Sequence, residues 1–136
     1  MANVRGGCLC GNLRYVAASE PVQTVICHCK NCQRQTGTAF SVLIVVPKAA
    51  LSFEGTLATY DLVGDSGLAT HRHFCPKCGS SIAIDGDLTP EFAYLNAGTL
   101  EDTSRVKPAV QLWCDSAQPW VRFSDETQNF PKGMSA

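Results

Sequence analysis

Apolar positions along the chain fall into short stretches rich in β-branched residues. Clusters of Gly, Pro, Asp and Ser separate them at intervals of about a dozen residues. The clearest stretches are residues 12–18 (NLRYVAA) and 41–46 (SVLIVV), and weaker ones are residues 56–62 (TLATYDL), 80–85 (SSIAID), 92–98 (FAYLNAG) and 109–114 (AVQLWC). This pattern predicts an all-β domain of small antiparallel sheets.

Helical periodicity does not persist for three turns anywhere in the sequence. Residues 30–37 (KNCQRQTG) predict one short helix ending at Gly37, because glycine readily takes the left-handed conformation that closes a helix. No linker or repeat divides the chain. We expect one domain over residues 1–130 and a frayed tail at residues 131–136 (PKGMSA).

Composition excludes several classes of function. A chain of 136 residues is long enough to bury roughly two thirds of its unfolded surface. Its 11 Lys and Arg balance 12 Asp and Glu without a basic block, which argues against nucleic-acid binding. The N-terminus lacks a signal-like apolar region, and no apolar stretch approaches the ~20 residues that span a bilayer. We expect a cytoplasmic protein without membrane association.

Eight cysteines are the strongest chemical signal in this sequence. In a reducing compartment their spacing favours metal binding or catalysis over disulfides. Cys8 and Cys10 (GGCLCG) would share one face of an extended segment, and Cys75 and Cys78 (FCPKCG) would lie in a turn closed by Gly79. Together they predict a four-thiolate structural zinc site that pins the N-terminal strand onto a central hairpin. Buried free thiols, a redox-active pair and an iron site are the alternatives.

A third cluster, VICHCKNC, contains Cys27, Cys29 and Cys32. The first two share a face if the strand continues through them, and the third follows at a turn into the predicted helix. Three ligands leave a fourth position for water or substrate, as in catalytic zinc sites. Three thiolates also make the ion a weak Lewis acid, suited to binding a thiolate or polarising an aldehyde.

A fourth protein ligand would instead make this cluster a second structural site. His28 should face away from its two neighbouring cysteines, and Cys114 is expected to be a packed core residue. His71 and His73 alternate onto the face of Cys75. The possible fourth ligands are therefore Cys114, His28, His71 and His73.

A binding pocket beside the third cluster is the next expectation. Lys30 and Arg34 lie close in sequence and would offset negative charge or attract an anionic substrate, unless they are ordinary surface charges. The predicted pocket wall consists of Arg34, Thr36, Phe40 and Trp113.

With GGCLCGNLRY, CHCKNCQRQTGTAF, HFCPKCGS, LNAGTLED and QPWVRF in this order, the sequence resembles the glutathione-dependent formaldehyde-activating enzyme (GFA) family over nearly its whole length. The resemblance implies a β-tent fold and two zinc sites. It assigns Cys8, Cys10, Cys75 and Cys78 to the structural site and Cys27, Cys29 and Cys32 to the catalytic one. The family pattern often has a histidine where this sequence has Gln111.

The activity implied by the resemblance joins formaldehyde to the thiol of glutathione, and it is classed as a carbon–sulfur lyase in the reverse direction. We therefore expect a zinc-dependent lyase-like enzyme acting on a small thiol adduct, with glutathione and a small aldehyde as partners. The alternatives are a non-catalytic, zinc-stabilised binding module and a thiol-based redox or metal-handling protein.

Overall fold

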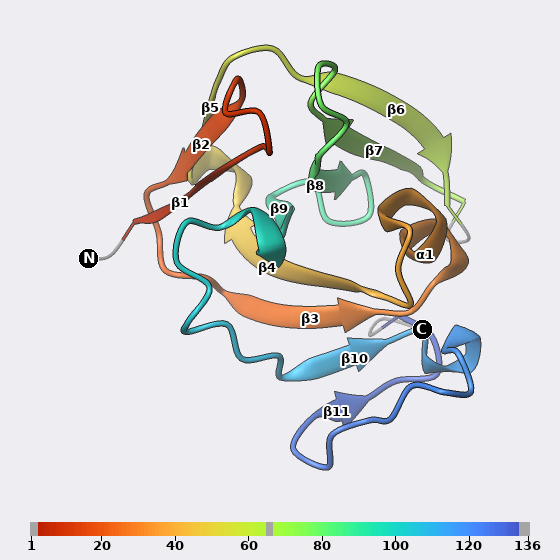
Figure 1. The fold of residues 1–136 in the computed structure, drawn as a ribbon. Coiled ribbons are helices and arrows are strands. Elements are labelled where there is room, and N and C mark those ends of the chain that lie inside the picture. Colours follow the sequence, from red (N-terminus) through yellow and green to blue (C-terminus); the bar gives the residue numbers. More distant parts are fainter. Residues whose placement is uncertain (1–2, 65–66, 134–136) are drawn as a thin grey trace.

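Two sheets form the framework of the chain, whose computed structural model describes residues 3–64 and 67–133 (Figure 1). A three-stranded sheet has the order β1-β2-β5, and an eight-stranded sheet has the order β11-β10-β3-β4-β9-β8-β7-β6. The strands are β1 (Val4–Gly7), β2 (Arg14–Ala17), β3 (Gln23–Cys27), β4 (Ser41–Pro47), β5 (Leu51–Glu54), β6 (Ala58–Val63), β7 (Ala69–Phe74), β8 (Ser81–Gly86), β9 (Phe92–Asn96), β10 (Val110–Leu112) and β11 (Gln128–Asn129). The all-β prediction is confirmed.

Pairing within the sheets is antiparallel except at one edge. There, β10 runs parallel to both β3 and β11. A parallel partner needs a long connection, and more than eighty residues separate β3 from β10 along the chain. The sequence pattern gave no sign of this parallel edge, because strand direction depends on how the intervening chain returns.

Both faces of the central strand β4 are buried, which explains its continuous apolar run. Ile44 and Val46 point into a core shared with β2, β8 and β9, and Leu43 and Val45 point into a second core on the other face. The first core contains Leu13, Tyr15, Ala17, Ile44, Val46, Cys75, Ile82, Ala83, Ala93, Leu95 and Ala97. The second contains Val25, Cys27, Cys32, Leu43, Val45, Ile84 and Val110. Cysteines thus take part in both cores.

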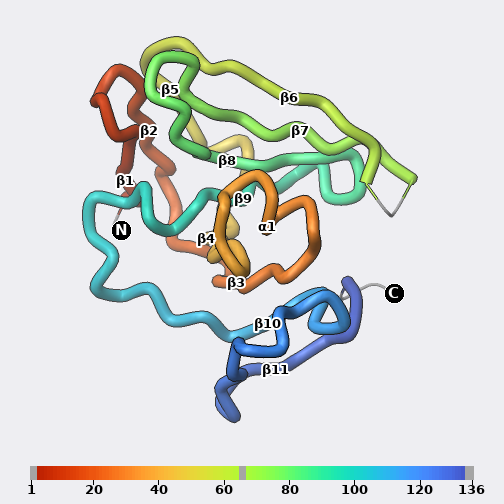
Figure 2. Tube along the Cα trace, turned by 45° about the vertical axis from the view of Figure 1, so that its right-hand side comes forward, coloured from red at the N-terminus to blue at the C-terminus, as the bar shows by residue number. Residues whose placement is uncertain are grey.

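The one α-helix of the described residues is α1 (Lys30–Thr36), as the sequence predicted. Gly37 ends it in the left-handed region with φ 68°. Short 3-10 turns also occur at η1 (Lys48–Ala50), η2 (Ala97–Thr99) and η3 (Cys114–Ser116). Figures 1 and 2 both show α1 lying between the β7–β8 hairpin and β10. None of the described helices is long and apolar enough to cross a membrane.

Residues near the C-terminus return to the eight-stranded sheet. The carbonyl of Lys132 accepts a hydrogen bond from the Trp113 amide, and that of Pro131 accepts one from Asp115. The first part of the predicted tail is therefore hydrogen-bonded to the domain, and residues 134–136 lie outside the described residues.

Candidate metal centres

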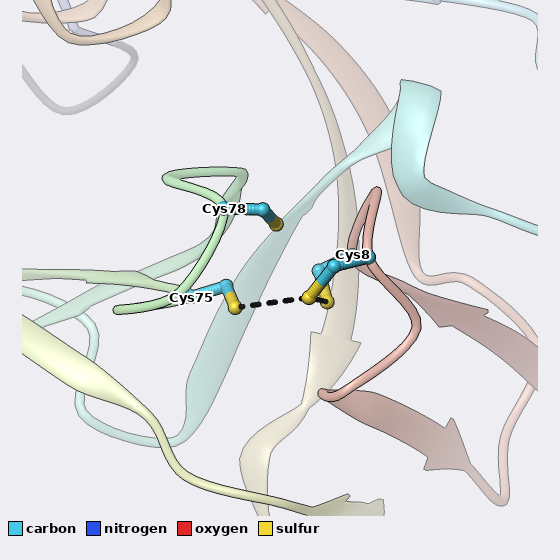
Figure 3. A group of neighbouring side chains, drawn as sticks. Cys8, Cys75 and Cys78 are labelled. Atoms are coloured by element: carbon cyan, nitrogen blue, oxygen red, sulfur yellow. Dashed lines mark hydrogen bonds between the residues drawn. The ribbon is translucent and has the colours of Figure 1, made fainter.

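Four thiols from two hairpins converge at the first candidate centre. Cys8 and Cys10 lie between β1 and β2, and Cys75 and Cys78 lie between β7 and β8. All four Sγ atoms are within 4.8 Å of one another, with 3.5 Å between Cys8 and Cys10 and 3.8 Å between Cys10 and Cys75. Figure 3 shows Cys75 and Cys78 facing Cys8 across the space between the two hairpins. A tetrahedral ion with metal–sulfur bonds of ~2.3 Å separates its sulfurs by roughly 3.8 Å, so the set fits zinc.

Cys8 and Cys10 reach the centre from a tight turn rather than from the extended segment that the sequence suggested. The strand ends at Gly7, and the Gly11 amide donates to the Cys8 carbonyl at 3.1 Å. The Leu13 amide donates to Cys8 Sγ at 3.2 Å. The turn therefore supplies both thiols and an N–H donor that stabilises a thiolate.

The Cys75–Cys78 turn has the predicted form. Gly79 has φ 80°, and its amide donates to the Cys75 carbonyl at 2.8 Å. The hydroxyl and amide of Ser80, together with the Cys10 amide, lower the pKa of the Cys78 thiol to about 5. A sulfur held as thiolate at neutral pH is the form that binds a metal.

Three thiols make the second candidate centre. Cys27 is the last residue of β3, Cys29 caps the N-terminus of α1, and Cys32 lies in its first turn. Their Sγ atoms are within 4.8 Å of one another, and Cys29 Sγ accepts the Cys32 amide at 3.3 Å. The strand does not continue through Cys29 as supposed, because the helix begins there. The cap brings the three sulfurs together instead.

A fourth protein ligand is absent from this cluster within residues 3–64 and 67–133. No other His, Cys, Asp or Glu ligand atom there joins the three sulfurs within 4.8 Å. The half-buried Cys114 donates to the Gln111 carbonyl at 3.7 Å instead. His71 contacts Asp61 at 2.6 Å, and His73 contacts Asp85 at 2.7 Å. The described residues therefore group three thiols that could hold a metal ion.

His28 is fully buried and is not grouped with the three thiols, although β3 ends before it at Cys27. Its Nε2 lies 2.7 Å from Gln111 Oε1, and its ring packs against Phe40 and Phe123 at centroid distances of 5.3 Å and 5.2 Å. Gln111, the position where the resembled pattern often has a histidine, also donates to Thr127 at 3.1 Å. His28 is held by packing and by this hydrogen bond.

Arg72 is a residue of the second centre that sequence reasoning missed. It lies on β7, is only 7% exposed, and points its Nη1 and Nη2 atoms at Cys32 Sγ at 3.8 Å and 3.7 Å. Nη1 also donates to Gln35 of α1 at 2.9 Å. Alternation in the HRHFC segment was the available signal, since it places Arg72 on the opposite face from His71 and His73.

Charge at the three thiols is unequal. Hydrogen bonds from Cys27 and Cys29, and then the charge of Arg72, lower the pKa of the Cys32 thiol to about 2. The pKa of the Cys27 thiol is raised, first by hydrogen bonds between Cys27 and the thiols of Cys29 and Cys32, and then by burial. Of the three thiols, Cys32 thus has the lowered pKa, and it is the one next to the guanidinium of Arg72.

Polar atoms without hydrogen-bond partners gather on the same sheet face. Ser41 is paired with Cys27 across β3 and β4, and Asn96 is paired with Leu43 across β4 and β9, so both share the face that carries Cys27. Two buried atoms on this face, Ser41 Oγ and Asn96 Nδ2, have no hydrogen-bond partner. Ser41 Oγ lies beside the Cys32 thiol but does not form a hydrogen bond of good geometry with it. Buried polar atoms are usually satisfied, so this face is suited to a polar group that the protein does not itself supply.

The four predicted pocket residues occupy different surroundings. Arg34 is exposed on α1, as is Lys30. Thr36 donates to the Cys32 carbonyl at 2.7 Å, and Phe40 packs on His28. Trp113 packs against the core cluster containing Cys27 and Cys32, beneath the Lys132 ammonium at 5.9 Å.

A family model and several named proteins are similar to this chain. The family model described as "Glutathione-dependent formaldehyde-activating enzyme" matches residues 3–116. A Halomonas elongata protein named "Putative glutathione-dependent formaldehyde-activating enzyme" is 24% identical over 132 residues, covering 93% of this chain and 84% of that protein. Proteins of the same name from Fusarium vanettenii and Aspergillus flavus are 32% and 31% identical over 51% and 60% of this chain. The chain spans only 41% and 44% of those two fungal proteins.

The fold also occurs in a solved structure. A crystal structure of a Rhodobacter sphaeroides protein superposes with a TM-score of 0.59 at 21% sequence identity. The match covers 74% of this chain and 91% of the other. At this identity the likeness establishes the fold alone.

Proposed function

Because the chain belongs to the glutathione-dependent formaldehyde-activating enzyme family, we propose that it joins a small thiol to a small aldehyde in a zinc-dependent reaction. Glutathione and formaldehyde are the family's partners. In the forward direction a carbon–sulfur bond forms, the carbonyl π bond breaks, and the thiol proton ends on the oxygen of S-hydroxymethylglutathione. The reverse reaction is that of a carbon–sulfur lyase.

The observation that supports this proposal is the open three-thiol cluster of Cys27, Cys29 and Cys32. A zinc ion held there would supply one free coordination position for a sulfur or a carbonyl oxygen. The cluster lies next to the cation of Arg72 and the unpartnered hydroxyl of Ser41. These side chains would hold a negative sulfur and offer a proton donor to an oxygen.

The other four thiols have a different part in the proposal. Cys8, Cys10, Cys75 and Cys78 would hold a structural zinc, because four thiolates complete a tetrahedral sphere and leave no position for substrate. This ion would join the β1–β2 hairpin of the small sheet to the β7–β8 hairpin of the large one. In this proposal the four-thiol site has a structural role and the three-thiol site has a catalytic role.

A Cys29→Ser variant tests the proposal. Serine is a good helix N-cap, so it preserves the start of α1 while removing one ligand that does not contact Arg72. Elemental analysis should find two zinc ions in the wild type and one in the variant. Exchange NMR of glutathione with formaldehyde should show a rate above the uncatalysed background only for the wild type.

Two outcomes would contradict the proposal. A variant that loses zinc and keeps the full exchange rate would show that the three-thiol cluster is not catalytic. A wild type that holds both zinc ions but never exceeds the background rate, even with alternative small thiols, would favour the non-catalytic binding module.

A further inference from the structure

A buried guanidinium needs an anion, and Arg72 forms no ion pair with a carboxylate among the residues that the structure describes. Arginine stays protonated in proteins, and leaving such a charge buried without compensation costs several kcal/mol. None of the ion pairs formed by residues 3–64 and 67–133 includes Arg72. Its contacts are Cys32 and the neutral amide of Gln35. The three-thiol cluster is therefore its counter-anion.

The charge balance at the cluster has a consequence for ligand binding. Three thiolates and one divalent ion carry a net charge of −1, and Arg72 brings the total to zero. Adding one anion to a neutral, buried site costs less electrostatic energy than adding it to a negative one. The exposed Lys30 and Arg34 contribute little here, because solvent and salt screen their charges.

The geometry points to Arg72 as the positioning residue that gives the three-thiol centre its affinity for an anionic ligand rather than a neutral one. This inference rests on the proposed function and names a determinant of its ligand class. Gln35 supports it, because its Oε1 fixes Nη1 at 2.9 Å and so orients the guanidinium toward Cys32. Nη2 of Arg72 lies 3.7 Å from Cys32 Sγ, so the positive charge of the guanidinium is adjacent to the three sulfurs.

The test compares anionic and neutral ligands on cobalt-loaded protein, in which visible absorption reports the ligands of a tetrahedral Co²⁺. Thiocyanate serves as an anion at any working pH, and imidazole at pH 8 serves as a neutral ligand. Arg72→Gln should keep both cobalt ions, bind thiocyanate at least about tenfold more weakly and bind imidazole within about twofold of wild type. Arg72→Lys should retain most of the thiocyanate affinity.

Two further variants keep the test decisive. Lys107→Met removes one exposed positive charge elsewhere and should leave both affinities unchanged. If Arg72→Gln does not fold, Gln35→Leu replaces it, with an expected threefold or greater loss of thiocyanate affinity and no change for imidazole.

The outcomes separate this inference from the proposed function. If Arg72→Gln lowers the affinities for thiocyanate and imidazole equally, or leaves thiocyanate binding unchanged, Arg72 does not select anions. Either result would leave the proposed metal site itself unaffected. A wild type whose cobalt spectrum responds to neither ligand nor to glutathione would overturn the proposed function and this inference together.

Discussion

His28 Nε2 and Gln111 Oε1 are 2.7 Å apart in the interior, and this contact joins β10 to the residue that follows β3. The histidine lies between two cysteines of the candidate catalytic cluster, yet it makes its hydrogen bond away from them. Both side chains are buried, and Gln111 supplies the hydrogen-bond partner of His28 Nε2. The contact therefore anchors the end of β3 without using His28 as a ligand.

Replacing Gln111 by leucine should destabilise the protein without removing metal. The substitution leaves the buried His28 Nε2 unpaired and also removes the hydrogen bond to Thr127, at a cost of about 1–3 kcal/mol. Chemical denaturation measures the loss, and Gln128→Leu on the exposed β11 is the matched control. A fall from two zinc ions to one in Gln111→Leu would contradict this expectation and show that the His28–Gln111 contact also supports the three-thiol centre.

The two candidate centres should differ in their contribution to stability. Cys8→Ser opens the site that links the two sheets, and structural zinc contributes free energy comparable to the whole stability of a domain. We expect its melting temperature to fall by more than about 10 °C, and that of Cys29→Ser by less than about half as much. Differential scanning calorimetry on zinc-loaded proteins makes the comparison. The opposite order would refute the division into structural and catalytic centres.

Much of the cysteine grouping follows from the sequence, because cysteine spacing is local information. The pairs at residues 8–10 and 75–78, and the triplet ending at Cys32, each lie in one continuous segment, so their grouping needs no knowledge of the fold. The α1 helix and its Gly37 cap are local in the same sense. Arg72 is different, because it approaches Cys32 from a strand forty residues away. Only the register of β7 in the folded sheet determines that contact.

The stabilising effect of the ion pair between His71 and Asp61 should depend on pH. Their hydrogen bond of 2.6 Å raises the pKa of His71, and the charges of Asp85 and Asp87 add to it. The folded-state pKa is the higher one, so the pair's stabilising effect is complete below the unfolded value of ~6.5 and is lost as pH rises through the folded value. NMR titration should show a lower His71 pKa in Asp61→Asn and in high salt. If the His71 pKa is the same in wild type, in Asp61→Asn and in high salt, Asp61 is not the cause of the raised pKa.

Replacing Gly55 by alanine should disturb the four-thiol centre. Gly55 has φ 103°, and a Cβ at this position would collide with the carbonyl oxygen of Asn12, two residues after Cys10. Gly55→Ala therefore adds a backbone clash to the conformational strain, and we expect a loss of about 2–4 kcal/mol in unfolding free energy. Gly67→Ala is the matched control, because its φ is 83° but its Cβ would meet nothing within 4 Å.

The same pair of variants tests how the clash reaches the metal. Moving the Asn12 carbonyl displaces the turn that carries Cys8 and Cys10, so Gly55→Ala should release zinc from the four-thiol centre faster to a chromophoric chelator. Gly67→Ala should cost about 1 kcal/mol and release zinc at the wild-type rate, because strain in the β6–β7 connection does not involve that turn. Equal release rates for both variants would mean that the β5–β6 connection does not support the metal-binding turn, and that the turn keeps its geometry through the bound metal alone.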